Sequence, residues 1–312
     1  MHNQTNSNSL IIDMNVDLNG LKLHNPITVA SGTFGFGREY SEFLDLNDIG
    51  AISVKGLTLE PRQGNEGIRI VETPMGMINS VGLQNPGVKA FIKEEIPFLR
   101  KFKAKIIANI NGNTIEEYCE MANILSDEDV DSLELNISCP NVKNGGLAFG
   151  TNPDVVKEVV SKVRKSAKKH LIVKLSPNVT DIKAIAKIVE EEGADCISLI
   201  NTLSGMAIDI HKRKPYLNRV TGGLSGPAIK PVALRMVYEV AQTVKIPILG
   251  MGGIVNSTDA IEFILAGATA IAIGTGNFSD PRTCIKVKSG IESYLKQNGF
   301  AGVKDIIGNI TI

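Results

Sequence analysis

The sequence lacks several features that mark particular classes of protein. It has no tryptophan, aromatic residues make up only 5% of the chain, and its four cysteines form no CxxC pair. A self-contained iron–sulfur cluster or zinc ribbon is therefore not expected, and no metal site is predicted. Sparse, unpaired cysteines indicate the reducing environment of the cytoplasm.

Excess charge and long apolar runs are lacking too. The 33 basic residues equal the 33 acidic ones, so the chain has no surplus of positive charge with which to bind nucleic acid. No apolar run reaches 18 residues, so we expect no membrane-spanning helix and no membrane partner. Residues 1–10 are mostly polar and have no basic segment followed by an apolar one. We interpret them as a flexible tail rather than a secretory signal.

What the sequence does have is a series of eight short apolar runs. They show no strict alternation of polar and apolar residues, which is typical of parallel strands buried on both faces. The runs are residues 26–30, 51–55, 105–109, 132–137, 171–175, 196–201, 246–250 and 270–274.

Amphipathic helices are predicted between these runs. Residues 153–170 carry valines at helical spacing, with Thr151 or Asn152 as the cap. A second helix begins at a Thr180 cap and ends at Gly193, and a third runs from Ser257 to Gly267. Residues 227–245 and 282–297 form two more.

Strand–helix alternation repeated eight times predicts an α/β fold of the (β/α)8 (TIM) barrel type, with an open doubly wound sheet as the alternative. The intervals 55–109 and 201–250 are long, so we expect inserted loops at the C-terminal mouth of the barrel. No Pro- or Ser-rich linker interrupts the chain, and residues 1–312 are interpreted as one domain.

Residues at the C-terminal ends of barrel strands carry the chemistry of such folds. Gly252-Gly253 and Gly274-Thr275 follow the last two runs, where glycine lets backbone N–H groups approach a phosphate. Lys55 and Lys174 lie at the C-terminal ends of the second and fifth runs, and a buried lysine is costly unless it faces an anion. The mouth is therefore predicted to bind an anionic ligand.

Cys139 follows the fourth run and is the candidate base or nucleophile, whereas Cys119, Cys196 and Cys284 are interpreted as packing residues. None of the four histidines follows a strand, which favours proton abstraction over acyl transfer; His170 is placed at a helix end. A set of asparagines at strand ends suits a polar heterocycle, because amides both donate and accept: Asn79, Asn109, Asn136, Asn141 and Asn201.

Four motifs in order resemble the dihydroorotate dehydrogenase family: NSVGLQNPG at 79–87, NISCPN at 136–141, INT at 200–202 and GGLSG at 222–226. The resemblance covers about residues 18–307. Cys139 at the base position, in place of serine, is similar to the class that does not associate with membranes. The segments at 82–87, 145–151 and 221–227 resemble the NAD-linked, B-type catalytic subunit.

The resemblance implies that the chain binds one FMN and oxidises dihydroorotate to orotate in pyrimidine biosynthesis. Cys139 would be the base that takes the proton from carbon 5, while carbon 6 gives a hydride to the flavin; Lys55 and Lys174 would be the other catalytic residues. The implied FMN contacts are Ser31, Lys55, Gly56, Asn109, Asn136, Lys174, Ile200, Gly226, Gly252, Gly253, Gly274 and Thr275. The implied substrate contacts are Lys55, Asn79, Ser80, Val81, Gly82, Leu83, Asn136, Asn141, Asn201 and Thr202.

The resemblance also implies a partner. B-type enzymes pass electrons to NAD through a second subunit that carries FAD and a 2Fe–2S cluster, in a heterotetramer of two catalytic and two electron-transfer chains. The sequence has no strand-linked GxGxxG motif and too few cysteines for that cluster, in agreement with a partner that supplies both. A fumarate-linked homodimer and a dihydropyrimidine dehydrogenase-like barrel are the alternatives.

Overall fold

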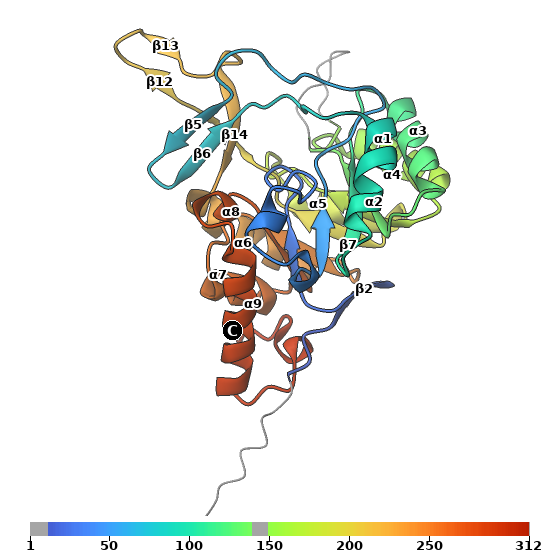
Figure 1. The fold of residues 1–312 in the computed structure, drawn as a ribbon, viewed down its shortest axis with the longest axis vertical. Helices are drawn as coiled ribbons and strands as arrows, with labels where there is room; N and C mark the ends of the chain where they lie inside the picture. The colour runs from blue at the N-terminus through green and yellow to red at the C-terminus, as the bar shows by residue number, and fades with distance from the viewer. Residues whose placement is uncertain (1–11, 139–148, 312) are drawn as a thin grey trace, which may run out of the picture.

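Eight parallel strands close into a barrel in this computed structural model, which describes residues 12–138 and 149–311 (Figure 1). The strands follow one another around the barrel in chain order, as predicted for a (β/α)8 barrel. They are β3 (Ile27–Val29), β4 (Ala51–Ser53), β7 (Lys105–Ile110), β8 (Ser132–Asn136), β9 (His170–Lys174), β10 (Cys196–Leu199), β15 (Ile248–Met251) and β16 (Ala270–Ile273).

Each predicted apolar run overlaps one of these strands, and β7, β9 and β15 each extend one residue beyond their run. Each of the eight strands pairs with both of its neighbours along residues that are almost all buried, because one face lines the barrel interior and the other packs under helices. Val29, Leu135 and Val173 are fully buried in this way. The absence of polar alternation in the runs is thus explained by burial on two sides.

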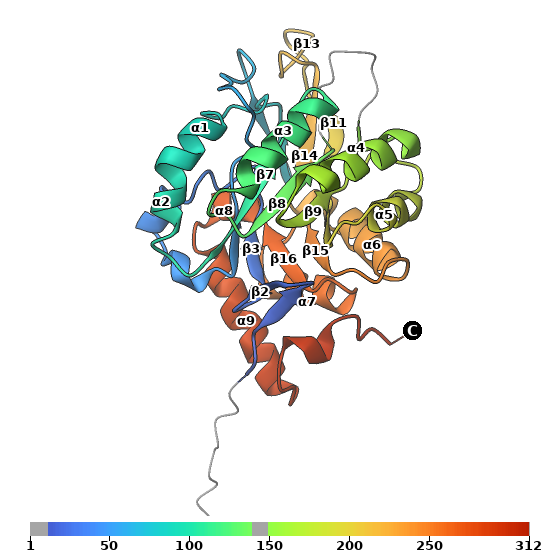
Figure 2. The same cartoon turned by 90° about the vertical axis from the view of Figure 1, so that its right-hand side faces the viewer.

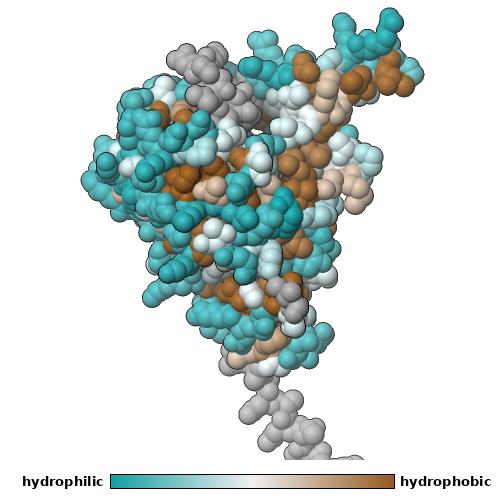
Figure 3. Space-filling model, turned by 180° about the vertical axis from the view of Figure 1, so that it is seen from behind, coloured by the Kyte–Doolittle hydropathy of each residue, from teal (hydrophilic) through white to brown (hydrophobic). Residues whose placement is uncertain are grey.

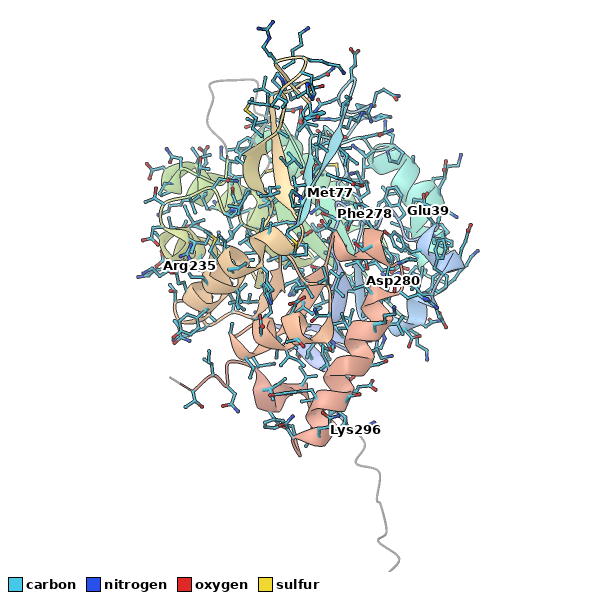
Figure 4. All side chains as sticks on the ribbon, turned by 90° about the vertical axis from the view of Figure 1, so that its left-hand side faces the viewer. Glu39, Met77, Arg235, Phe278, Asp280 and Lys296 are labelled. Carbon is cyan, nitrogen blue, oxygen red and sulfur yellow. The ribbon has the colours of Figure 1, made fainter. Side chains whose placement is uncertain are left out.

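Helices surround the barrel, and Figure 2 shows them packed around strands β7, β8 and β9. Along α9, Figure 4 labels Asp280 before its start and Lys296 near its end. The helices are α1 (Val88–Ala90), α2 (Ile96–Leu99), α3 (Ile115–Ser126), α4 (Pro153–Ser166), α5 (Ile182–Glu191), α6 (Lys230–Ala241), α7 (Ser257–Leu265), α8 (Gly276–Ser279) and α9 (Thr283–Gln297). Among the described residues, none of these helices is long and apolar enough to cross a lipid bilayer.

Three predicted helix boundaries were wrong. Helix α4 ends at Ser166, and His170 is the first residue of β9 rather than a helix residue. Asp181, not Thr180, caps α5, because its carboxylate accepts hydrogen bonds from Lys183 N and Ala184 N. The helix predicted over 227–245 is a 3₁₀ turn, η4 (Pro227–Ile229), followed by α6, since a second proline lies in the first turn of α6 and lacks an N–H to donate.

The first strand-to-strand connection also differs from the predicted alternation. Between β3 and β4, where every residue is described, the chain forms two short 3₁₀ turns, η1 (Tyr40–Glu42) and η2 (Leu46–Asp48), instead of an α-helix. Gly35 and Gly37 adopt positive φ angles of 58° and 83°, which turn the chain back before a helix can propagate. Phe34 stacks on Tyr40 and fills the space that a helix would cover.

The two long intervals carry the insertions that were predicted. Strands β5 (Ile70–Thr73) and β6 (Gly76–Asn79) come from the first, and β11 (Leu203–Met206) and β14 (Thr221–Ser225) from the second. They pair in the order β11-β14-β6-β5 as an antiparallel sheet above the barrel mouth (Figure 1). The β12 (Ile208–Asp209) and β13 (Lys214–Pro215) hairpin projects beyond this sheet.

The other end of the barrel is covered by the hairpin of β1 (Val16–Leu18) and β2 (Leu21–Leu23), which places apolar side chains against the core. His170 lies there, with its Nε2 bonded to Leu18 O and its Nδ1 to Ser132 Oγ. The short η3 (Phe91–Glu95) joins α1 to α2, and η5 (Val303–Ile306) follows α9. This end is closed by packing, so ligand access is at the opposite, C-terminal end.

Candidate active site

A cavity of about 530 Å³ opens at the C-terminal ends of the eight barrel strands, under the inserted sheet. That volume lies within the range of small-molecule sites, about 300–1,000 Å³. Each barrel strand contributes to the wall either through its last residues or through those that directly follow it, and β6 and β14 supply the upper side. The cavity therefore lies where barrel folds carry their chemistry.

The structure brings the predicted site residues together in this one cavity. Its wall contains every described residue of the implied FMN contacts, such as Ser31 and Lys55. It also contains every described residue of the implied substrate contacts, such as Asn79 and Asn201. Cys139 and Asn141 lie outside the described residues. The grouping is a matter of geometry, and the individual roles stay predictions.

Two lysines supply positive charge to the cavity. Lys174 is only 4% exposed, and neither its ammonium nor that of Lys55 hydrogen-bonds to another described residue. Burial lowers the pKa of Lys55, because desolvation disfavours its charged form. Both ammonium groups are thus available to a ligand, and the anionic ligand expected from the cost of burying a lysine stays a prediction.

Glu134 on β8 is a charged residue that the sequence reasoning missed. It is fully buried, and its carboxylate accepts hydrogen bonds from Ser53 Oγ at 2.7 Å, Asn109 Nδ2 at 2.6 Å and Ser198 Oγ at 2.7 Å. Burial raises its pKa, but the charge of Lys174 and the three hydrogen bonds lower it by more, so the carboxylate is ionised. A glutamate inside the apolar run at 132–137 was the available signal.

A chain of short hydrogen bonds fixes the wall beside β8. Ser138 Oγ donates to Asn136 Oδ1 at 2.5 Å and accepts from Asn201 Nδ2 at 2.5 Å. On the opposite side, Asn79 Nδ2 donates to Gly223 O at 3.2 Å. These contacts hold three of the predicted amides in defined orientations toward one cavity.

Protein packing requires glycine at some positions of the cavity rim and not at others. Gly252 and Gly253 have φ angles of 128° and 80°, and a Cβ on Gly253 would lie 2.8 Å from Lys230 Cβ. At Gly274 the nearest protein atom to a built Cβ is Ala30 Cβ at 3.5 Å, an ordinary contact. The packing of the protein therefore explains Gly253, whereas it leaves room for a side chain at Gly274.

Other polar residues of the wall were also missed. Asn178 donates to Thr202 O at 3.1 Å and accepts from Ser204 N at 3.0 Å, and Arg219 lines the outer rim. They follow β9 and β13 at a distance from the strand ends, so counting strand-end residues did not find them. Thr275 Oγ1 donates to Ser225 Oγ at 2.7 Å and joins the barrel rim to the inserted sheet.

The remaining cysteines fit their predicted packing role. Cys196 and Cys284 are buried, and burial raises the pKa of the Cys284 thiol to about 12, so it stays protonated. Cys119 is partly buried and packs against the core. None of the three lines the cavity.

A (β/α)8 barrel whose mouth gathers two cations, several amides and glycine-rich turns has the architecture of a barrel enzyme. The family model for dihydroorotate dehydrogenase matches residues 13–295. The chain belongs to the dihydroorotate dehydrogenase family of oxidoreductases.

Two curated relatives indicate which type of dihydroorotate dehydrogenase the chain is similar to. The catalytic subunit of dihydroorotate dehydrogenase B (NAD(+)) from Alkaliphilus metalliredigens is 60% identical over 299 residues, which cover 96% of this chain and 99% of the relative. The subunit of the same name from Geotalea uraniireducens is 57% identical over 297 residues, covering 95% and 97%. The predicted similarity to the B-type catalytic subunit is confirmed.

Proposed function

We propose that this chain oxidises dihydroorotate to orotate, a step of pyrimidine biosynthesis, with FMN held in the mouth cavity of a single catalytic domain. The observation that carries the proposal is the cavity itself. It combines two lysines, whose ammonium groups hydrogen-bond to no other described residue, and the asparagine-rich motifs of the family in one wall. A carboxylated, amide-bearing substrate and an electron-rich ring suit these groups.

The residues present fit FMN. The cavity is large enough, its floor offers Lys174 and Asn109, and its rim offers glycine backbone at Gly252-Gly253 and Gly274. We assign the phosphate to this rim and the ring to the floor, with contacts from the implied cofactor set: Ser31, Lys55, Gly56, Asn109, Asn136, Lys174, Ile200, Gly226, Gly252, Gly253, Gly274 and Thr275. When bound, FMN supplies the acceptor for the hydride that leaves carbon 6.

The substrate side of the cavity is assigned to the asparagines and to Lys55. The ammonium of Lys55 would pair with the substrate carboxylate, which restores the charge stabilisation that burial removes. Asn136 and Asn201, held by Ser138, would bind the ring amides. The rest of this side is the implied set Asn79, Ser80, Val81, Gly82, Leu83, Asn141 and Thr202.

Cys139 is the proposed base. It directly follows Ser138, which is buried and anchored by two hydrogen bonds at the substrate side of the cavity. A thiolate near neutral pH removes a proton far better than a hydroxyl, since serine is a much weaker acid than cysteine. Removal of the carbon 5 proton by Cys139 and of the carbon 6 hydride together give orotate.

The electrons are proposed to leave through a partner chain with FAD and a 2Fe–2S cluster, which reduces NAD in the cytoplasm. Support comes from the relatives, whose names specify NAD(+) and a catalytic subunit. Exposed apolar residues also favour assembly, because large solvent-facing patches mark interaction sites. Figure 3 shows apolar side chains on the protruding β12–β13 hairpin, where Ile208 and Ile210 are exposed. We propose two catalytic and two electron-transfer chains.

The test is purification of the tagged chain from its own cells, followed by flavin analysis and a dihydroorotate assay with NAD or with fumarate. A yellow complex that contains a second flavoprotein and reduces NAD supports the proposal. A yellow chain that uses fumarate alone contradicts the partner and the NAD linkage. A colourless chain that does not take up FMN contradicts the whole assignment.

A further inference from the structure

A polar layer lies directly beneath the cavity floor. Ser53, Glu134 and Ser198 each precede a cavity residue by two positions, on β4, β8 and β10 respectively. Ser53 and Ser198 both donate to the Glu134 carboxylate, which also accepts from the cavity residue Asn109, so the three side chains lie together in the barrel interior beneath the floor. None of the three lines the cavity, so none can touch a ligand held there.

Glu134 is the centre of this layer. Glu134 is fully buried, and its two carboxylate oxygens accept three hydrogen bonds from three different strands. An ionised carboxylate in such a place is retained only when charge and donors compensate its desolvation. The compensating charge is that of Lys174 on the neighbouring strand.

The link between Glu134 and Lys174 is one of charge without a hydrogen bond. Three shorter donors occupy the carboxylate, and the Lys174 ammonium makes no hydrogen bond to another described residue. Lys174 therefore keeps its three N–H donors for a ligand while its charge is balanced from below. A direct ion pair would have used one of them.

The second link runs through Asn109. Its Nδ2 donates to Glu134, and its Oδ1 accepts from Asn111 Nδ2 at 2.8 Å. Because the carboxylate can only accept, the amide is fixed in one of its two orientations. Asn109 lines the cavity, so Glu134 decides which amide atom is the acceptor there.

We infer that Glu134 is a positioning residue for the cofactor: its carboxylate balances the charge of Lys174 and sets the amide orientation of Asn109. The inference rests on the proposed function, since it concerns the FMN side of the cavity. Reduction adds negative charge to the cofactor, so the charges beneath it set how readily reduction occurs. Glu134 lowers the midpoint potential of bound FMN, and Lys174 raises it.

The experiment measures the midpoint potential of the full chain loaded with FMN, by dye-coupled reduction. Glu134→Gln keeps the shape and removes the charge, and it is expected to raise the potential. Lys174→Met is expected to lower it. Glu134→Asp keeps the charge and should remain near the wild-type value. Ser198→Ala, which removes one hydrogen bond and leaves the carboxylate charged, is the control for a merely structural effect.

Each outcome decides the inference. An unchanged potential in folded, FMN-loaded Glu134→Gln overturns it and leaves the proposed function standing. An equal shift in Glu134→Asp or Ser198→Ala overturns it as well, because charge would not be the cause. If Glu134→Gln does not fold, the double variant Glu134→Gln, Lys174→Met must fold and melt at a higher temperature than either single variant. A double variant that is no more stable contradicts the charge balance between Glu134 and Lys174. Wild-type protein that takes up no FMN contradicts the proposed function, and the inference with it.

Discussion

Asn201 Nδ2 donates a 2.5 Å hydrogen bond to Ser138 Oγ, and so ties the end of β10 to the end of β8 across the cavity wall. The residue after Ser138 is Cys139, the proposed base. The contact gives that base a fixed point of attachment one residue away. A substitution of Ser138 therefore tests the position of the base while leaving the cysteine itself unchanged.

Ser138→Ala should lower the rate of dihydroorotate oxidation by about tenfold, because small displacements of a catalytic group are costly. The variant loses both hydrogen bonds of the Ser138 hydroxyl while keeping its volume nearly constant. Steady-state kinetics measures the effect. Ser293→Ala, on an exposed face of α9, is the matched control and should behave as wild type.

Lys55 predicts a pH dependence of orotate binding. Burial lowers the pKa of Lys55 below its ordinary value, so part of the ammonium loses its proton at a pH where a surface lysine stays charged. A bound carboxylate raises the pKa again, so binding should take up protons and weaken as pH rises through the lowered pKa. Calorimetry in two buffers of different ionisation enthalpy measures the uptake.

Lys55→Met should abolish this proton uptake and weaken binding by about 10- to 100-fold, the loss of one charge-assisted pair. Lys89→Met, at an exposed position, is the control. Orotate binding that is as tight in Lys55→Met as in wild type would remove Lys55 from the substrate site.

Substitutions at Gly274 and Gly253 distinguish a glycine needed for the approach of a ligand from one needed for the packing of the protein. Gly274→Ala should leave the melting temperature of the FMN-free protein unchanged, since its Cβ meets only ordinary contacts, yet weaken FMN binding by crowding the phosphate. Gly253→Ala should lower stability by about 1–3 kcal/mol, because its φ is positive and its Cβ strikes Lys230. Fluorescence titration with FMN and thermal melting measure the two effects. Tight FMN binding by Gly274→Ala would show that the phosphate does not bind beside Gly274.

His170 predicts that the protein loses stability in mild acid. The pKa of His170 is lowered, because the effect of burial is larger than the opposing effect of its hydrogen bond to Leu18 O, which raises the pKa. The unfolded chain therefore takes up a proton near the ordinary pKa of about 6.5 before the folded one does. Stability is full above that pH and falls as pH drops through it.

The check is the difference in melting temperature between pH 8 and pH 5.5. His170→Gln, which keeps a donor for Leu18 O, should have a smaller difference than wild type. Some dependence should remain, because burial also lowers the pKa of His24. An unchanged difference in His170→Gln would assign the acid sensitivity to other groups.

The sequence predicted the barrel because a strand buried on both faces leaves a continuous apolar run, and eight such runs were separated by helical patterns. It also predicted the lysines, glycines and asparagines of the cavity wall, since chemistry in a barrel lies at strand ends, whereas other parts of the wall, such as residues 80–83 and Gly226, came from the resemblance to the family. Lys55 and Lys174 were recognisable there because a lysine after an apolar run is costly to bury without an anion.

What escaped prediction depends on contacts between distant segments. Glu134 was hidden within a strand, because its stabilisation comes from Ser53 and Ser198, 81 and 64 residues away. Arg219 reaches the cavity through the path of the second inserted segment, and Asn178 through the loop between β9 and α5; spacing specifies neither path. The end of α4 was misplaced because the pairing of His170 with Ser132 overrides a helical pattern.

The role of Cys139 as the base is tested most directly by the anaerobic reduction of bound flavin by dihydroorotate in a stopped-flow instrument, compared between wild type and Cys139→Ser near neutral pH. Cys119→Ser is the control, since Cys119 packs away from the cavity. We expect Cys139→Ser to slow flavin bleaching by about 10²- to 10⁴-fold, the contribution of a general base, while Cys119→Ser matches wild type. Equal rates in Cys139→Ser and wild type would contradict the role of Cys139 as the base.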